Sequence, residues 1–205
     1  EGSTKTLSYK FVEGPFTSAL INALNNPNKH FWLVIEELNR APAASVFGDV
    51  FQLLDRSSDG SSSYQISISD PIYKDYLDER LNHKIEKLYI PKNLSIYATM
   101  NSSDQGVMPL DTAFKRRWQF KYIPLDFEKA CPTGNIPVAV NNGKKIEVSW
   151  SSFAQAVNSL LSREEIPEDR HLGPFFLVEK DLLSPEKALT GKIFIYLWDD
   201  VLRHG

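Results

Sequence analysis

This sequence is poor in the residues that hold together small secreted or zinc-bound domains. It has one cysteine, Cys131, in 205 residues, which excludes an internal disulfide framework and favours a reducing, cytoplasmic compartment. Its histidines are far apart and lack the spacing of zinc ligands: they are His30, His83, His171 and His204. No apolar run approaches the ~20 residues that span a bilayer, so no membrane contact is expected.

A strong charge of one sign is also missing. Lys and Arg total 23 and Asp and Glu total 26, which gives a formal net charge of −3 at pH 7. Because a protein that wraps nucleic acid carries a basic field, any contact with DNA is expected to come from other domains. The phosphate-binding signature Gly-x-x-x-x-Gly-Lys-[Ser/Thr] is absent as well. Residues 2–6 (GSTKT) resemble it superficially but lack its first glycine and its spacing, and we interpret them as a tag remnant or linker.

What the sequence does contain is a continuous apolar run that ends in two carboxylates. Residues 31–35 (FWLVI) are all apolar, and Glu36 and Glu37 follow at once. Such a run is typical of a strand buried on both faces in a parallel sheet, and sites of open α/β sheets lie at the carboxyl ends of such strands. The run therefore predicts a site that holds a metal ion and orients a water. Taken alone, it is equally compatible with a strand that leaves the core for solvent.

A second candidate strand carries polar residues at the same end. Residues 93–100 (NLSIYATM) are rich in β-forming side chains, and a polar loop follows from Asn101. Beyond the loop, Pro109 or Leu110 is expected to open a short helix, with Asp111 in its first turn and a basic end. A third strand is predicted over residues 119–125 (QFKYIPL).

Five segments in this order resemble the AAA+ NTPases of the McrB group, the GTP-dependent subunits of modification-dependent restriction systems. The matching segments are residues 35–41, 47–54, 89–93, 100–104 and 110–118. The resemblance implies an α/β fold, namely part of a P-loop NTPase (AAA+) core with a parallel sheet, an inserted β-hairpin and a C-terminal helical lid. In this family the phosphate loop lies upstream of a segment resembling residues 9–25, so we expect this chain to begin inside the NTPase domain.

The resemblance implies a role for each polar residue at the strand ends. Glu36 takes the position that orients Mg²⁺ and its waters, where most of the family has Asp, and Glu37 matches the residue that polarises the attacking water. Asn101 matches the polar sensor, whose amide can bond both the water and a γ-phosphate oxygen. A turn-capping asparagine is the alternative for Asn101. Asp104 belongs to the Met-Asn-x-x-Asp signature of the GTP-using members and is expected to contact nucleotide.

Three arginines are assigned by the same resemblance. Arg116 and Arg117 match the arginine fingers that enter a neighbouring subunit's site, because a guanidinium presents a fork of donors to phosphate oxygens. A solvated basic helix end is the alternative for both. Arg170 lies where the family has its second sensor region and is a candidate phosphate contact, with an ordinary loop position as the alternative. Asn39 and Arg40 directly follow the acidic pair and are candidates for supporting it, Arg40 by pairing with either carboxylate or by facing a neighbour.

The chain is predicted to divide into two parts. Residues 1–127 are assigned to the C-terminal part of the α/β core, and residues 128–205 to the helical lid. Apolar periodicity predicts helices over residues 16–25, 43–54, 150–161 and 192–202. Two alternating runs, residues 64–68 and 84–90, predict the inserted hairpin with a polar excursion between them, and residues 132–145 are expected to be a linker or a small hairpin.

The resulting hypothesis is a Mg²⁺-dependent NTPase that hydrolyses GTP or ATP in a homo-oligomeric ring and drives a nuclease subunit against foreign DNA. Both nucleotides stay open because the Arg-Ser that follows the signature in the family is Gln105-Gly106 here. This chain alone is expected to be inactive, since it lacks the phosphate loop. Two alternatives remain: a catalytically inactive oligomerisation or partner-docking module, and a MoxR- or dynein-like ATPase for protein remodelling.

Overall fold

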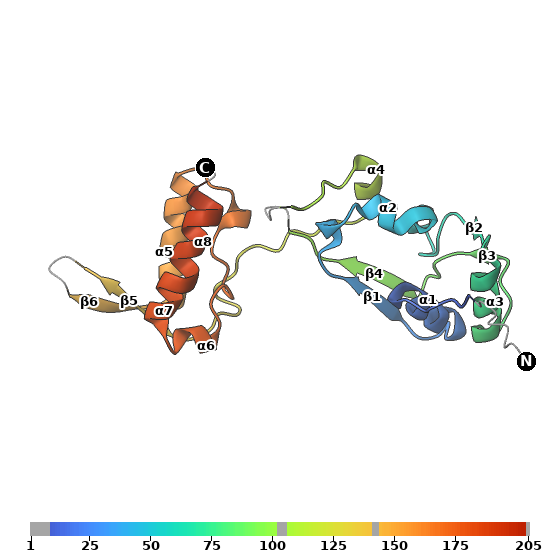
Figure 1. The fold of residues 1–205 in the computed structure, drawn as a ribbon, viewed down its shortest axis with the longest axis horizontal. Coiled ribbons are helices and arrows are strands. Elements are labelled where there is room, and N and C mark those ends of the chain that lie inside the picture. The colour runs from blue at the N-terminus through green and yellow to red at the C-terminus, as the bar shows by residue number, and fades with distance from the viewer. Residues whose placement is uncertain (1–8, 102–105, 141–143, 204–205) are drawn as a thin grey trace, which may run out of the picture. The chain divides into compact units, whose positions relative to one another are not determined.

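The computed structural model describes residues 9–101, 106–140 and 144–203, in two compact units, residues 1–120 and residues 121–205. The helices and strands are α1 (Pro15–Asn25), β1 (Phe31–Ile35), α2 (Ala43–Phe47), β2 (Ile66–Ser67), α3 (Pro71–Arg80), β3 (Lys87–Leu88), β4 (Leu94–Ala98), α4 (Thr112–Lys115), β5 (Asn135–Ala139), β6 (Lys145–Ser149), α5 (Trp150–Arg163), α6 (Glu179–Leu182), α7 (Pro185–Ala188) and α8 (Phe194–Tyr196) (Figure 1). Within the described ranges, none of the helices has the length and apolar character needed to cross a bilayer.

In the first unit, β1 and β4 pair in parallel and form a two-stranded sheet (Figure 1). The register runs from Phe31 opposite Leu94 to Ile35 opposite Ala98, so the carboxyl ends of both strands lie side by side. Helix α1 begins at Pro15, whose fixed φ suits a first helical position, and packs its apolar side chains against this sheet. The predicted α/β class and parallel sheet are confirmed in this small form.

This sheet is covered on one face only. Phe31 and Leu33 pack against the core, whereas Trp32 and Val34 are 60% and 61% exposed. Tyr97, the register partner of Val34, is 57% exposed on the same outer face. The prediction of a strand buried on both faces is therefore wrong for the part of the chain that the structure describes, because no second layer packs on this face there.

The segment after the acidic residues is helical, but it is not the continuous helix predicted over residues 43–54. Helix α2 ends at Phe47, and its C-cap Gly48 has a φ of 50° and a ψ of −131°, outside the helical region. Glycine reaches this conformation because it has no Cβ atom to clash. The chain continues as 3₁₀ turns over Gly48–Leu54, which bury Leu53 and Leu54 in the core.

The predicted inserted hairpin is short and contains a helix. Strands β2 and β3 pair antiparallel, over two residues each. Helix α3 lies between them and begins after Asp70, whose carboxylate accepts amide hydrogen bonds from the first helical turn. The predicted polar excursion is helical here because an Asp N-cap followed by Pro71 favours a helix start.

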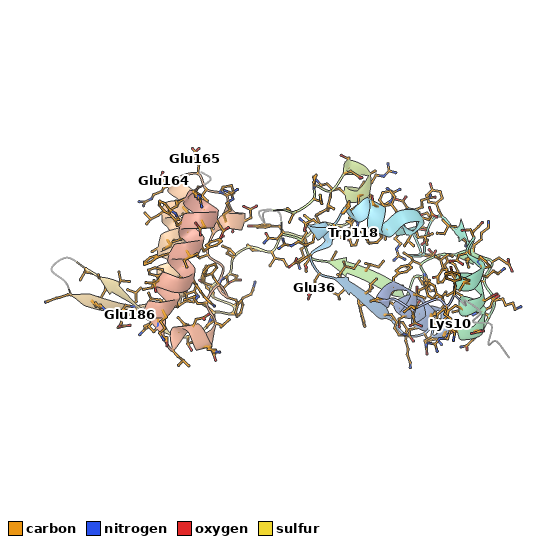
Figure 2. All side chains as sticks on the ribbon, viewed as in Figure 1. Lys10, Glu36, Trp118, Glu164, Glu165 and Glu186 are labelled. Carbon is orange, nitrogen blue, oxygen red and sulfur yellow. The ribbon has the colours of Figure 1, made fainter. Side chains whose placement is uncertain are left out.

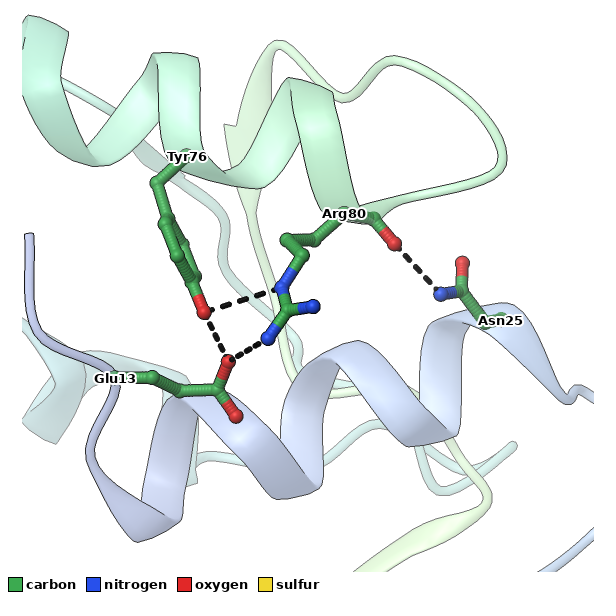
Figure 3. A network of polar contacts seen from close by, with 4 residues as sticks. All are labelled: Glu13, Asn25, Tyr76 and Arg80. Atoms are coloured by element: carbon green, nitrogen blue, oxygen red, sulfur yellow. Dashed lines mark hydrogen bonds and ion pairs between the residues drawn. The ribbon is translucent and has the colours of Figure 1, made fainter.

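Polar contacts attach α3 to α1 and to the segment that precedes α1 (Figure 3). The carboxylate of Glu13 accepts hydrogen bonds from the hydroxyl of Tyr76 and from Nη2 of Arg80, the latter at 3.2 Å. The Tyr76 hydroxyl is the main cause that lowers the pKa of the Glu13 carboxyl below its usual range. Nδ2 of Asn25 donates to the carbonyl of Arg80 at 2.9 Å. The inserted helix is therefore fastened to the rest of its unit by polar bonds as well as by the core.

The region after the polar loop differs from its prediction in two ways. Helix α4 begins at Thr112, and Asp111 is its N-cap rather than a first-turn residue: Oδ1 accepts the amide hydrogen of Phe114 at 2.6 Å. Residues 119–125 form no strand, so the third predicted strand is wrong. A strand needs a neighbour for its backbone groups, and here Tyr122 and Ile123 are instead 68% and 79% exposed.

The second unit has a core of its own around Trp150. Helix α5 begins at this residue, and the hydroxyl of Ser149 accepts the amide hydrogen of Ser152 at 3.2 Å, which confirms the predicted helix and its cap. Trp150 is fully buried, and its indole N–H donates to the carbonyl of Pro174 at 2.8 Å. The segment predicted as a linker or small hairpin, residues 132–145, contains β5, which pairs antiparallel with β6 at the end of that segment and beyond it.

Candidate functional site

Polar residues that follow β1 and β4 meet at one edge of the sheet. The amide of Thr99 donates to the carbonyl of Ile35, and the amide of Leu38 donates to the carbonyl of Thr99, both at 2.9 Å. These bonds extend the pairing past the two strands. Glu36 lies at the carboxyl end of β1 (Figure 2), in the acidic loop (residues 36–40). Asn101 lies two positions after Thr99 and is the first residue of the polar loop. Two segments that are distant in the sequence thus share this edge.

Glu37 has a left-handed backbone, with φ of 53° and ψ of 51°. Such a conformation costs a non-glycine residue on the order of 1–3 kcal/mol and persists where the surroundings impose it. Here a hydrogen bond to the residue after β4 supports this conformation: the amide of Glu37 donates to Oγ1 of Thr99 at 3.3 Å. Glu37 therefore lies in a turn that is hydrogen-bonded to the residue after β4 and not in a fraying strand end.

The carboxylates of the acidic loop are accessible. Glu36 is exposed, and the side chain of Glu37 is 61% exposed. Nε of Arg40 lies 2.6 Å from Oε2 of Glu37, in a pair whose arginine is 47% exposed. Of the two carboxylates open to Arg40 in the sequence analysis, the structure pairs it with Glu37.

Asn39 ties the acidic loop to the polar loop. Its side chain is nearly buried, and Nδ2 donates to the carbonyl of Asn101 at 2.7 Å. Its own carbonyl accepts the amide hydrogen of Met108 at 2.7 Å. Oδ1 of Asn39 is buried and has no hydrogen-bond partner among the described residues. Asn39 therefore contacts the polar loop on both sides of residues 102–105.

The carboxylates that the structure describes at this edge are too few to enclose a metal ion by themselves. The acidic loop supplies the two carboxylates of Glu36 and Glu37, and no group of three or more His, Cys, Asp or Glu able to hold a metal exists among the described residues. Mg²⁺ usually takes one or two carboxylates and completes its shell with waters and substrate phosphates. Asp104, the other acidic candidate, lies outside the described residues.

The two adjacent arginines of the basic segment (residues 111–118) have different surroundings. Arg116 is exposed at the end of α4. The side chain of Arg117 is 8% exposed, its Nη2 lies 2.8 Å from Oδ2 of Asp55, and its Nε donates to the same oxygen at 3.0 Å. Its guanidinium also lies over the ring of Phe51, with Cζ 4.0 Å from the centroid. Of the two predicted fingers, Arg116 has the accessible guanidinium, and Arg117 is bound within its own unit.

Arg170 belongs to the second unit. It ends the 3₁₀ turn Glu168–Arg170 and is partly buried. Its carbonyl accepts a hydrogen bond from the hydroxyl of Tyr196 at 3.1 Å, and Nε2 of the next residue, His171, lies 3.0 Å from the carbonyl of Ile166. The predicted phosphate contact of Arg170 stays a prediction.

Two residues of this region were missed from the sequence. Thr99 holds the turn at Glu37, and its position as the first polar residue after β4 was an available signal. Asp55 pairs with Arg117 from 62 positions away, and nothing in the local sequence indicates that partner. Both act on residues that the sequence did single out.

Comparisons with known proteins agree with the resemblance of this sequence to restriction-system proteins. No family model matches the chain. It is 45% identical over 200 residues to the type II restriction enzyme BsuMI component YdiS of Bacillus subtilis (strain 168), which covers 97% of this chain and 57% of that protein. It is 29% identical over 173 residues to the type IV methyl-directed restriction enzyme EcoKMcrB subunit of Escherichia coli (strain K12), which covers 84% of this chain and 34% of that protein. The chain thus spans little more than half of one relative and about a third of the other. It is a close homologue of a type II restriction enzyme component and has a weaker similarity to a McrB subunit.

Proposed function

We propose that this chain supplies the acidic motif and the helical lid of a McrB-like AAA+ nucleoside triphosphatase, which hydrolyses GTP or ATP in the whole protein. The observation that carries the proposal is the meeting of Glu36 and Glu37 with the loop from Asn101 at the carboxyl edge of a parallel sheet. Ligands of open α/β sheets bind at such edges. The similarity to a McrB subunit favours a nucleotide as that ligand.

Each residue of the edge has a role in this proposal. Glu36 would hold Mg²⁺ and its waters, and the ion would supply positive charge to the phosphates. Glu37 orients the attacking water, which its exposed carboxylate can reach. Asn101 donates its amide to the γ-phosphate or the water. Asp104 and Arg170 are proposed nucleotide contacts. The phosphate loop, which this sequence does not contain, has to come from another part of the whole protein.

The proposal extends to the assembly. Arg116 serves as the finger that enters a neighbouring subunit's site in a homo-oligomeric ring, because its guanidinium is exposed. Arg117 supports it from within its own unit through Asp55. Both relatives are named as restriction enzyme components, which favours a nuclease subunit as the partner that hydrolysis drives. DNA is reached through other domains.

The test is nucleotide hydrolysis by the full-length gene product, with GTP and ATP in parallel and with or without Mg²⁺. The expected result is Mg²⁺-dependent turnover that Glu37→Gln lowers about 10²–10⁴-fold, since the amide keeps the shape but loses the negative charge. Glu86→Gln is the matched control, because Glu86 is an exposed glutamate paired with Lys74 away from this edge. Its turnover should equal that of the parent protein. No turnover with either nucleotide, at concentrations where a ring forms, would contradict the proposal.

A further inference from the structure

The carboxylate proposed to orient the water is itself held by a neighbour on the same turn. Arg40 lies three positions after Glu37, and its amide donates to the carbonyl of Glu37 at 2.9 Å, which closes a 3₁₀ turn. The side chains repeat this contact, with Nε of Arg40 2.6 Å from Oε2 of Glu37. A charge-assisted bond of this length is short for its class. The turn geometry therefore sets where both charged groups can lie.

The turn is fixed to the sheet, so the position of Arg40 is not arbitrary. The amides of Glu37 and Leu38 bond the hydroxyl and the carbonyl of Thr99. Between Leu38 and Arg40, the buried side chain of Asn39 bonds the carbonyl of Asn101. Consequently every residue from 37 to 39 is anchored to the neighbouring strand or its loop. The side chain of Arg40 therefore extends from a hydrogen-bonded turn toward Oε2 of Glu37.

Without a partner, Glu37 would have no fixed orientation. Its side chain has several rotatable bonds and is 61% exposed, so packing restricts its rotamers less than it would restrict those of a buried side chain. Phosphoryl transfer depends chiefly on positioning and electrostatics, so the loss of orientation should reduce the rate. Arg40 supplies the missing constraint and leaves Oε1 of Glu37 for the water.

We propose that Arg40 is a positioning residue for hydrolysis, which holds the Glu37 carboxylate in one orientation at the sheet edge. The inference rests on the proposed role of Glu37. The pair contributes to the rate and little to folding, because ion pairs this exposed add little to stability. Its consequence is a coupling: the effect of Arg40→Ala on the rate depends on whether a carboxylate is present at position 37.

A double-mutant cycle in the full-length protein tests this coupling. Arg40→Ala should lower kcat about 10–100-fold and leave KM within twofold, because misplacement of a reacting group costs rate rather than substrate binding. Arg40→Lys should recover part of kcat, since an ammonium can also reach the carboxylate. In a Glu37→Gln background, Arg40→Ala should cause no further loss in single-turnover rates. Lys74→Ala, which breaks an exposed ion pair elsewhere in the unit, should leave kcat unchanged.

The outcomes separate this inference from the function on which it rests. If Glu37→Gln lowers turnover as expected and Arg40→Ala leaves kcat within twofold, Arg40 does not position Glu37 and the inference alone fails. If Arg40→Ala lowers the rate equally in both backgrounds, Arg40 acts through another group or through the fold, and the inference also fails. If the parent protein hydrolyses neither nucleotide, both the function and the inference are overturned.

Discussion

In the acidic loop the residues that anchor the backbone are neutral, whereas in the basic segment the anchor carries a charge. Asn39 and Thr99 fix the acidic loop, and the carboxylates of Glu36 and Glu37 stay exposed. In the basic segment, Arg117 is nearly buried against Asp55. Its neighbour Arg116 is exposed.

The difference follows from the cost of burying polar groups. An amide or hydroxyl can be buried when it is hydrogen-bonded, but a buried charge also needs an opposite charge. The acidic loop buries no carboxylate, because the side chains of Glu36 and Glu37 are exposed. The basic segment buries one charge, that of Arg117, and its ion pair with Asp55 and its contact with the ring of Phe51 offset the cost of burial. The two adjacent arginines should therefore respond differently to the same substitution.

Arg116→Ala should have the largest effect, and on turnover only. If Arg116 enters a neighbouring site, hydrolysis by the full-length protein should fall about 10³–10⁵-fold. The free energy of unfolding should stay within about 0.5 kcal/mol of the parent, because an exposed side chain is removed. Lys115→Ala, an exposed change one position earlier, is the matched control and should change neither quantity.

Mixing subunits gives the Arg116 prediction its sharper form. A finger acts on the next subunit, so mixed rings of Arg116→Ala and Glu37→Gln proteins contain some sites with an intact finger and an intact Glu37. They should recover part of the turnover that each variant lacks alone. Turnover near the parent level in Arg116→Ala would contradict the proposed role of Arg116 as a finger.

Arg117→Ala should act on stability first. Removing one partner of a buried ion pair leaves the other uncompensated, which costs about 3 kcal/mol at the lower end of the observed range. The lower end applies because Asp55 is 28% exposed. Urea-induced unfolding of this chain measures the loss, and Arg116→Ala in the same chain is the control. Combining Arg117→Ala with Asp55→Ala should cost less than the sum of the two single changes. A loss below about 1 kcal/mol for Arg117→Ala would mean that its ion pair contributes no more to stability than an exposed pair does.

The sequence predicted this fold best where neighbours in the chain decide the structure. The apolar stripe of α1 and the Ser149 cap of α5 are local, and both are present. The helix expected over residues 43–54 failed at Gly48, whose positive φ a periodicity count does not detect. The strand expected over residues 119–125 failed because a strand depends on a partner elsewhere in the chain.

The candidate site divides in the same way. That residues after β1 and β4 share one edge follows from parallel pairing, which the sequence pattern indicated. The roles of Arg116 and Arg117 could not be separated, because their difference depends on Asp55 in another element. The partner of Arg40 stayed open until the turn at Glu37 was known, since its left-handed φ brings the two side chains together.

The smallest expected effect concerns Asn39, and Asn93 provides its control. Both are nearly buried asparagines at opposite ends of the same sheet. Asn39 donates to the carbonyl of Asn101, whereas Asn93 donates to the carbonyls of Ala23, Asn26 and Lys29. Asn39→Ala and Asn93→Ala should each reduce the free energy of unfolding by about 0.5–1.5 kcal/mol, because each removes the hydrogen bonds that a nearly buried amide donates to backbone carbonyls.

Only Asn39→Ala should also slow hydrolysis, by about tenfold, because it releases the acidic loop from the polar loop that carries Asn101. Urea unfolding of the chain and steady-state turnover of the full-length protein measure the two effects separately. Equal loss of turnover in both variants would mean that the rate follows general stability, so the neutral anchor would have no specific part in holding the exposed carboxylates. A rate loss confined to Asn39→Ala would show that this amide positions the loop, which is the property that separates the acidic loop from the basic segment.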